Sequence, residues 1–391
     1  MNPRLSRIAV LTSLALAGAG AATVAQAQSA MVAPSGFAAE AAAARAAMMG
    51  DPEAALRHAR AARQLSASNA DAPARLIEEA TASWLEAEAL MRVNRPQESR
   101  PAIERGLAIA AEHAANSKLH ADLLRSRAAL ALVTGEVSAA HADLIAAQQI
   151  FRSLGESRSQ AIVLQNLGSL YSQARDFERA LTYFEESARA HSGDAALTLA
   201  AHNNRGNALK ELGRFDEAER EFALALEAAR AMNSPLLQAR ILSNLASAQA
   251  LRGDHVAAET NVQLGLALAQ QAAQGWEPYL WGVRAQIALA RQDLPTARTY
   301  IERTFNGVDL DTSTMPYREF HETARRIYSG LGDATSASRH TTAFQRLDEQ
   351  GRRIAATTSA ALTTTRLATA DEAHLRPSNG AAGGMALALR R

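Results

Sequence analysis

A small residue recurs eight times along this chain, each time about five positions after a turn signal. The gaps between successive members are 44, 41, 40, 38, 40, 39 and 40 residues, and the members are Ala55, Ser99, Ala140, Ala180, Ala218, Ala258, Ala297 and Ala337. A fixed period of this length is typical of solenoids, in which each structural unit packs only on its neighbours. The spacing therefore predicts a stack of similar units and favours a function in recognition.

Turn signals in the same register predict that each unit is a pair of helices. Five of the eight turns begin with Gly, which suits the left-handed residue that ends a helix, and an Asp often follows and can cap the next helix. The turns are Gly50-Asp51, Asn94-Arg95, Gly135-Glu136, Arg175-Asp176, Gly213-Arg214, Gly253-Asp254, Gln292-Asp293 and Gly332-Asp333.

Two further positions of each unit, four and seven residues after the small residue, are expected in the core, because these spacings mark one face of a helix. We call the equivalent positions of successive units a column. The first column is Ala59, Ile103, Leu144, Phe184, Phe222, Val262, Ile301 and Thr341. The second is Ala62, Gly106, Ala147, Ser187, Ala225, Gly265, Thr304 and Phe344. The pattern predicts an all-α solenoid of about eight helical hairpins, with about sixteen repeat helices and no sheet.

The clearest unit runs from Ala161 to Gly193 and carries a recognisable set of large and small residues. Its first helix has Leu164, Leu167, Gly168 and Tyr171, and its second has Phe177, Ala180, Leu181 and Phe184. This set resembles the tetratricopeptide repeat, in a long form whose period is near 40 residues. The resemblance covers roughly residues 36–351, is strongest in the central units, and departs from the family in mostly lacking the proline that often closes a unit. It implies a right-handed superhelix with a concave groove that binds a protein or peptide segment.

The two ends of the chain differ from the repeats. Residues 1–27 combine Arg4 and Arg7, an uncharged stretch and Ala25-Gln26-Ala27, which is typical of a signal peptide cleaved after Ala27. The alternative is an uncleaved membrane anchor; without Cys, the chain cannot be a lipoprotein. We expect a periplasmic or secreted protein with no stable membrane span after cleavage. Residues 352–376 are expected to form a capping or exit helix, and 377–391 a flexible tail.

Composition and motifs argue against several function classes. Removing Arg4 and Arg7 changes the balance of basic and acidic residues from 41 against 40 to 39 against 40, a net charge near −1. A surface without basic excess does not favour nucleic acid as a partner. No phosphate-binding loop, nucleophile elbow or His-Glu-x-x-His motif occurs. We therefore expect no enzymatic activity, no catalytic residues, no metal site and no cofactor.

Three asparagines, Asn166, Asn204 and Asn244, occupy one position in three consecutive first helices. Asn is a poor residue for a helix interior because its side chain competes for backbone hydrogen bonds, so its recurrence suggests a use. In similar repeats this position faces the concave groove, where an amide can both donate to and accept from a peptide main chain. The alternative is that each Asn bonds the adjacent repeat and holds the stack together. Neighbouring groove positions are Gln165, Asn203, Asn207, Lys210, Arg240 and Arg125.

Two functions are consistent with these features. The first is an exported, non-enzymatic adaptor that binds a peptide or protein segment, with Arg240, Lys210 and Arg125 favouring an acidic side chain or carboxylate. The second is the input domain of a signalling system, because a signal sequence, long repeats and an exit helix in this order resemble periplasmic sensor modules. Such a sensor would be truncated or detached from its membrane-bound output domain.

Overall fold

The computed structural model describes residues 36–48, 50–272 and 275–375, with side chains through residue 365. The expected signal peptide and the tail 377–391 lie outside the described residues. The described part holds sixteen α-helices, one 3₁₀ turn and no strand, which confirms the all-helical prediction. The helices are α1 (Gly36–Ala47), α2 (Pro52–Ser66), α3 (Ala72–Arg92), α4 (Pro96–His113), α5 (Lys118–Thr134), α6 (Val137–Ser153), α7 (Ser157–Gln173), α8 (Phe177–Ala190), α9 (Ala195–Glu211), α10 (Phe215–Ala231), α11 (Pro235–Arg252), α12 (His255–Ala272), α13 (Glu277–Ala290), α14 (Leu294–Thr304), α15 (Arg318–Gly330) and α16 (Ala334–Leu375).

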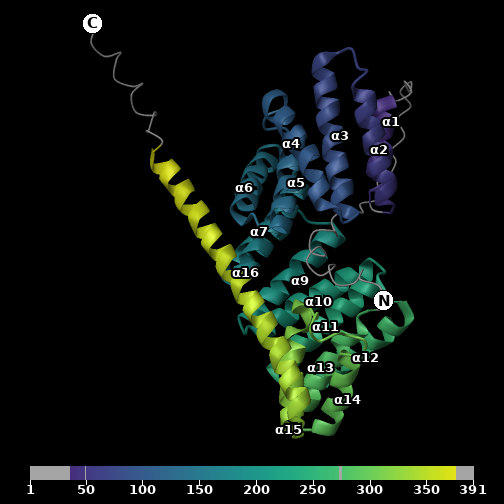
Figure 1. Cartoon of the computed structure of the whole chain (residues 1–391), viewed down its shortest axis with the longest axis vertical. Coiled ribbons are helices and arrows are strands. Elements are labelled where there is room, and N and C mark those ends of the chain that lie inside the picture. Colours follow the sequence, from purple (N-terminus) through teal and green to yellow (C-terminus); the bar gives the residue numbers. More distant parts are fainter. Residues whose placement is uncertain (1–35, 49, 273–274, 376–391) are drawn as a thin grey trace, which may run out of the picture.

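The helices pair into eight consecutive hairpins, from α1 with α2 to α15 with α16, and the hairpins stack into a solenoid (Figure 1). Each second helix also packs on the first helix of the next hairpin. In addition, first helices of neighbouring hairpins contact each other, as α3 does with α5, α7 with α9, and α11 with α13. Contacts of this kind place the first helices on the inner side of the curve.

The eight small residues lie where their spacing predicts, in the contact between helices. All eight are buried, and seven of them, including Ala180 and Ala218, are 0 % exposed. The column four positions later is buried from Ala59 through Ile301. Small side chains in this column let the two helices of a hairpin approach closely, because little volume separates their axes.

Left-handed residues end the first helix in seven of the eight hairpins. Four of them are glycines, represented by Gly253 with φ 94°, and three are Asn94, Arg175 and Gln292 with φ 61°, 61° and 58°. Where an Asp follows the turn, it caps the second helix; Asp51, for example, accepts a hydrogen bond from the Ala54 amide at 2.9 Å. These turns fix where each hairpin reverses.

Close packing between a first-helix glycine and a phenylalanine repeats in the central hairpins. A Cβ atom added to Gly168 would lie 2.5 Å from Phe184, and one added to Gly206 would lie 2.6 Å from Phe222. Both phenylalanines are buried in the second helix of the same hairpin. The Leu-Gly and Phe positions of the repeat therefore encode a direct contact.

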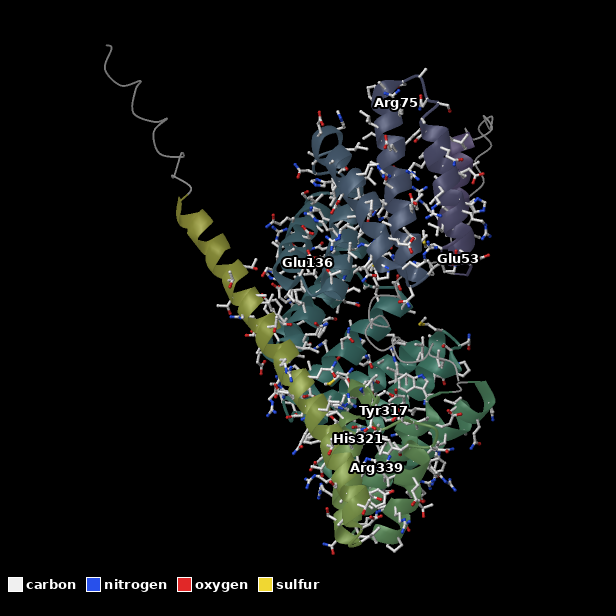
Figure 2. All side chains as sticks on the ribbon, in the orientation of Figure 1. Glu53, Arg75, Glu136, Tyr317, His321 and Arg339 are labelled. Atoms are coloured by element: carbon white, nitrogen blue, oxygen red, sulfur yellow. The ribbon has the colours of Figure 1, made fainter. Side chains whose placement is uncertain are left out.

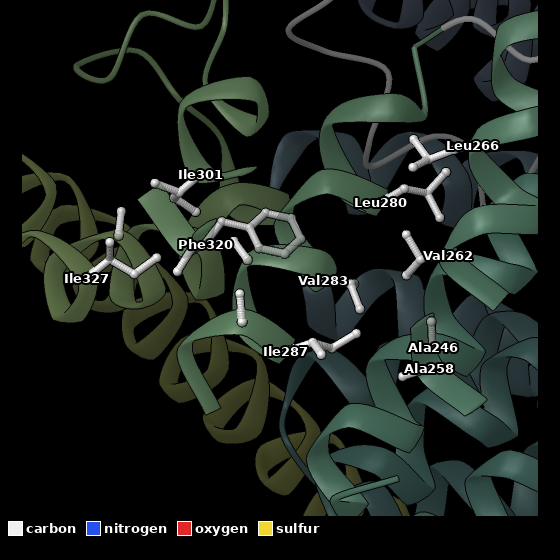
Figure 3. Close-up of a cluster of buried hydrophobic side chains, with 14 of the residues drawn as sticks. Ala246, Ala258, Val262, Leu266, Leu280, Val283, Ile287, Ile301, Phe320 and Ile327 are labelled. Atoms are coloured by element: carbon white, nitrogen blue, oxygen red, sulfur yellow. The ribbon is translucent and has the colours of Figure 1, made fainter. Parts of the chain in front are cut away.

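The hydrophobic core continues from one hairpin into the next. Figure 3 shows this in the C-terminal half, where Val262 and Leu266 of α12 face Leu280 of α13, and Ile301 of α14 lies near Phe320 of α15. Such continuity is expected of a solenoid, in which no single hairpin buries its own apolar surface. Among the described residues, no helix combines the length and apolar character needed to cross a membrane.

The last hairpin differs from the sequence prediction. Thr341 and Phe344, expected in its core, are only half-buried, and the buried positions are instead His340, Ala343 and Leu347. In this hairpin His340 of α16 faces α15, with its Nδ1 2.9 Å from Nδ1 of His321. The expected helix at 352–376 is not a separate element, because α16 runs without a break from Ala334 to Leu375.

The long helix α16 also contacts α6 and α7, which lie far earlier in the chain (Figure 1). Leu362 of α16 is 2 % exposed and joins a buried cluster with Leu170, Tyr171 and Phe184. The Ser138 hydroxyl donates a hydrogen bond of 3.4 Å to the carbonyl oxygen of Ala361. This contact joins the eighth hairpin to the third and fourth.

Candidate functional site

The nine candidate residues come from four first helices, which line the inner side of the solenoid. Arg125 lies on α5; Gln165 and Asn166 lie on α7; Asn203, Asn204, Asn207 and Lys210 lie on α9; and Arg240 and Asn244 lie on α11. First helices supply inner-surface positions at each repeat, so one inner surface can carry all nine. Their surroundings nevertheless differ from one residue to the next.

A hydrogen-bonded asparagine cluster joins α9 to α11. The Asn244 Nδ2 donates to Oδ1 of Asn203 at 2.9 Å, and the Asn203 Nδ2 donates to Oδ1 of Asn204 at 3.3 Å. Asn203 is buried, whereas Asn204 and Asn244 are half-buried. Asn244 thus bonds the adjacent repeat through Asn203, as in the alternative role for the asparagine position, while Asn204 keeps part of its amide at the surface.

Gln165 also bonds an adjacent repeat. Its Nε2 donates to the carbonyl oxygen of Leu197 at 3.1 Å, and the side chain is buried. Asn166 beside it is 7 % exposed. Asn207 and Lys210, farther along α9, are half-buried and keep surface that a ligand could reach.

Arg125 is neutralised within the protein. Its guanidinium lies 3.6 Å from Glu88 of α3 and 3.7 Å from Asp122 of α5. Burial opposes the charge of Arg125, but Glu88 and Asp122 still hold its pKa above the ordinary value. Burial raises the pKa of Asp122, and Arg125 and Lys118 oppose that shift. The repeat pattern does not single out these acids, although Asp122 precedes Arg125 by one helical turn, a spacing typical of ion pairs.

Arg240 has the opposite environment. Its Nε is buried and has no hydrogen-bond partner among the described residues, and burial lowers the pKa of the side chain. Asn244 follows it by one helical turn on α11, so the two side chains share a helix face. A buried donor without a partner costs free energy. The side chain as a whole is only half-buried, so its guanidinium can pair with an anionic ligand group. Arg240 is therefore the strongest candidate for an anion-binding residue on this surface.

A separate hollow of about 260 Å³ is lined by α8, α9 and α10 and includes none of the nine candidates. Four of its charged residues pair with one another: Arg205 lies 3.2 Å from Glu221, and Arg214 lies 2.7 Å from Glu217. These four charges are already matched and do not select a charged ligand. The described residues also contain no cluster of three or more His, Asp or Glu suited to a metal ion.

Two segments of the repeat region match protein-family models. Residues 161–190 and 197–271 each match models described as tetratricopeptide repeat. These two segments are tetratricopeptide repeats. The matched segments span α7 with α8 and α9 to α12, and these helices carry every candidate residue except Arg125. No curated protein sequence matches the chain.

Solved structures show a likeness in fold over most of the chain. The apo quorum sensor NprR from B. thuringiensis matches with a TM-score of 0.63 and 12% identity, covering 80% of this chain and 87% of that chain. Apo RapI matches with a TM-score of 0.60 and 13% identity, covering 81% and 87%. A Rap protein complexed with competence and sporulation factor matches with a TM-score of 0.51 and 16% identity, covering 81% and 87%. At these identities the likeness shows the fold.

Proposed function

We propose that this protein is an exported, non-enzymatic adaptor that binds an extended peptide or protein segment along the inner side of α7, α9 and α11. The single observation that carries the proposal is Arg240, a half-buried cation whose buried Nε has no hydrogen-bond partner among the described residues. A side chain in this state is suited to an anionic group brought by a ligand, such as a carboxylate. The Rap protein solved with competence and sporulation factor supports recognition of a protein or peptide factor by this fold.

The residues divide into ligand-binding and supporting roles under this proposal. Asn204, Asn207, Lys210 and Asn244 offer amide and ammonium groups that are only half-buried, so they can reach a peptide main chain. Gln165 and Asn203 bond neighbouring repeats and fix the spacing of these groups. Because the inner surface is formed by packed helices, a ligand finds it already in shape and little ordering is required on binding.

Selection of peptides from a random library on the full chain tests the proposal. We expect the selected peptides to be enriched in Asp, Glu or a free C-terminal carboxylate near one position, and Arg240→Gln to weaken their binding at least ten-fold. The matched control is Arg220→Gln on α10, which removes a cation from the hollow lined by α8, α9 and α10. Peptides that bind wild type and Arg240→Gln equally, or a library that yields no saturable binder, would reject the proposal.

The input domain of a signalling system remains the second candidate function, and α16 favours it. This helix is 42 residues long, more than twice the length of most repeat helices, and its C-terminal end extends away from the solenoid (Figure 1). A helix of this kind can transmit a change in the repeats to another protein. Capture from membrane extract tests this role: a membrane-bound output protein retained by wild type, but lost when residues 366–391 are removed, would favour the sensor over the adaptor.

A further inference from the structure

The solenoid is closed by a contact that its repeat pattern does not require. Repeats normally contact only their neighbours, so a change in pitch at one interface is free to spread along the stack. Here the C-terminal half of α16 lies on α6 and α7, which are five and four hairpins away from its own. The chain from α7 to α15 therefore forms an arc whose two ends are joined by one helix.

The N-terminal half of α16 is fixed firmly to its own hairpin. The Arg318 Nε of α15 donates to Asp348 at 3.0 Å, and the Nδ1 atoms of His321 and His340 lie 2.9 Å apart. Figure 2 shows His321 beside this lower part of α16. This half of the helix consequently moves with α15.

The C-terminal half of α16 makes far fewer buried contacts with the rest of the protein. Between residues 352 and 365 only Thr358 and Leu362 are buried, one helical turn apart, and Ile354 on the same helix is 42% exposed. Val137 and Phe177, at the start of α6 and α8, pack against the cluster that receives Leu362. A contact whose buried side chains between residues 352 and 365 are one leucine and one threonine is small enough to open while the repeats stay folded.

We propose that the docking of Leu362 onto α6, α7 and α8 is a latch that holds the arc of hairpins four to eight at one pitch. When Leu362 leaves its cluster, α16 stays attached to α15, and the arc opens by small rotations at each repeat interface. The latch itself does not depend on the proposed function. Because α7, α9 and α11 lie within the arc, its opening also changes the spacing of the proposed binding residues, and only that consequence depends on the proposed function.

Cysteine cross-linking tests the latch without any ligand, since the natural chain has no Cys. Cysteines placed by Ser138→Cys and Ala361→Cys in the full chain should be joined rapidly by a short bifunctional maleimide within one molecule. Adding Leu362→Ser should slow this reaction at least ten-fold. Adding Ile354→Ser, a matched change at an exposed position of the same helix, should leave the rate unchanged.

X-ray scattering of the cysteine-free Leu362→Ser and Ile354→Ser chains tests the change in pitch. We expect a larger radius of gyration for Leu362→Ser alone, with the helical content of all chains equal by circular dichroism. If Leu362→Ser loses helix, Leu362→Ala replaces it in both measurements. An unchanged cross-linking rate, an unchanged radius of gyration, or products that join two molecules would each overturn the proposal. Binding of the selected peptides to Arg240→Gln is measured separately, so failure of the latch and failure of the adaptor function are distinguishable.

Discussion

Asn203 and Asn204 are adjacent in α9 but have different tasks. Asn203 bonds Asn244 across the repeat interface, while Asn204 is half-buried and contributes only its oxygen to Asn203. We expect Asn204→Ala to weaken binding of the selected peptides by about 1–3 kcal/mol, the cost of leaving a polar partner unpaired. Its melting temperature should fall only slightly, since the variant loses one long hydrogen bond of 3.3 Å to Asn203. Asn203→Ala, which also loses the 2.9 Å bond from Asn244, should lower the melting temperature more. Isothermal titration and thermal unfolding of both variants decide this, and the reverse pattern would assign Asn204 to the stack.

The pair of His321 and His340 should make the protein less stable in acid. Burial, with the charge of His340 and Arg346, lowers the pKa of His321 to about 3, and burial with Arg339 lowers that of His340 to about 4. In the unfolded chain both histidines bind protons near pH 6.5, so between that pH and about 4 the unfolded state holds more protons. The free energy of unfolding therefore falls as the pH drops through this window.

Urea unfolding at pH 7.5 and at pH 4.5 measures this loss. The double variant His321→Asn, His340→Asn should lose less stability between the two pH values than wild type does, because its side chains do not titrate. Equal losses in the two proteins would show that other groups control the acid sensitivity. Ser313, whose hydroxyl lies 2.8 Å from Nε2 of His321, keeps other polar partners in the variant. Its hydroxyl also donates to the carbonyl oxygen of Leu310 at 2.8 Å and accepts from Arg346 at 3.0 Å.

At the scale of the helical hairpin, the left-handed turn residues give a direct test of the repeat register. Gln292 has φ 58° at the end of α13, where a residue with a Cβ is strained. We expect Gln292→Gly to stabilise the protein by about 1 kcal/mol in urea unfolding. The matched change Gly253→Ala, at the same point of the preceding hairpin with φ 94°, should destabilise it. A loss of stability in Gln292→Gly would contradict this account of the turn.

The fold of each hairpin could be predicted from sequence because its information is local. Small residues such as Ala218, the turns and the Gly206–Phe222 pair lie within 40 residues of each other and repeat. The candidate site was harder to predict. In sequence, Arg125 and Arg240 are equivalent candidates, and only the structure shows that Arg125 pairs with Glu88, which comes from another repeat. The docking of Leu362 had no signal in the periodicity, because it joins hairpins that are not neighbours.

At the scale of the whole molecule, residues 1–27, which lie outside the described structure, predict that the protein is exported. We expect cleavage after Ala27, so that the mature chain begins at Gln28 and is found in the periplasm or outside the cell. Intact-mass measurement of the protein purified from a Gram-negative host, with fractionation of the cells, tests this directly. A species that retains Met1 and sediments with membranes would instead support the anchor interpretation.

The hydrogen bond between Ser138 and Ala361 spans 223 residues, and this separation has a consequence for the order of folding. The hairpins can form one after another as the chain emerges from a ribosome or a translocation channel, since each needs only its neighbours. The α6–α16 contact can form only after the last hairpin is available, because contacts between distant segments wait for the chain that connects them. Closure of the arc thus marks a chain that has been delivered in full, and a nascent or prematurely ended chain would remain an open spiral.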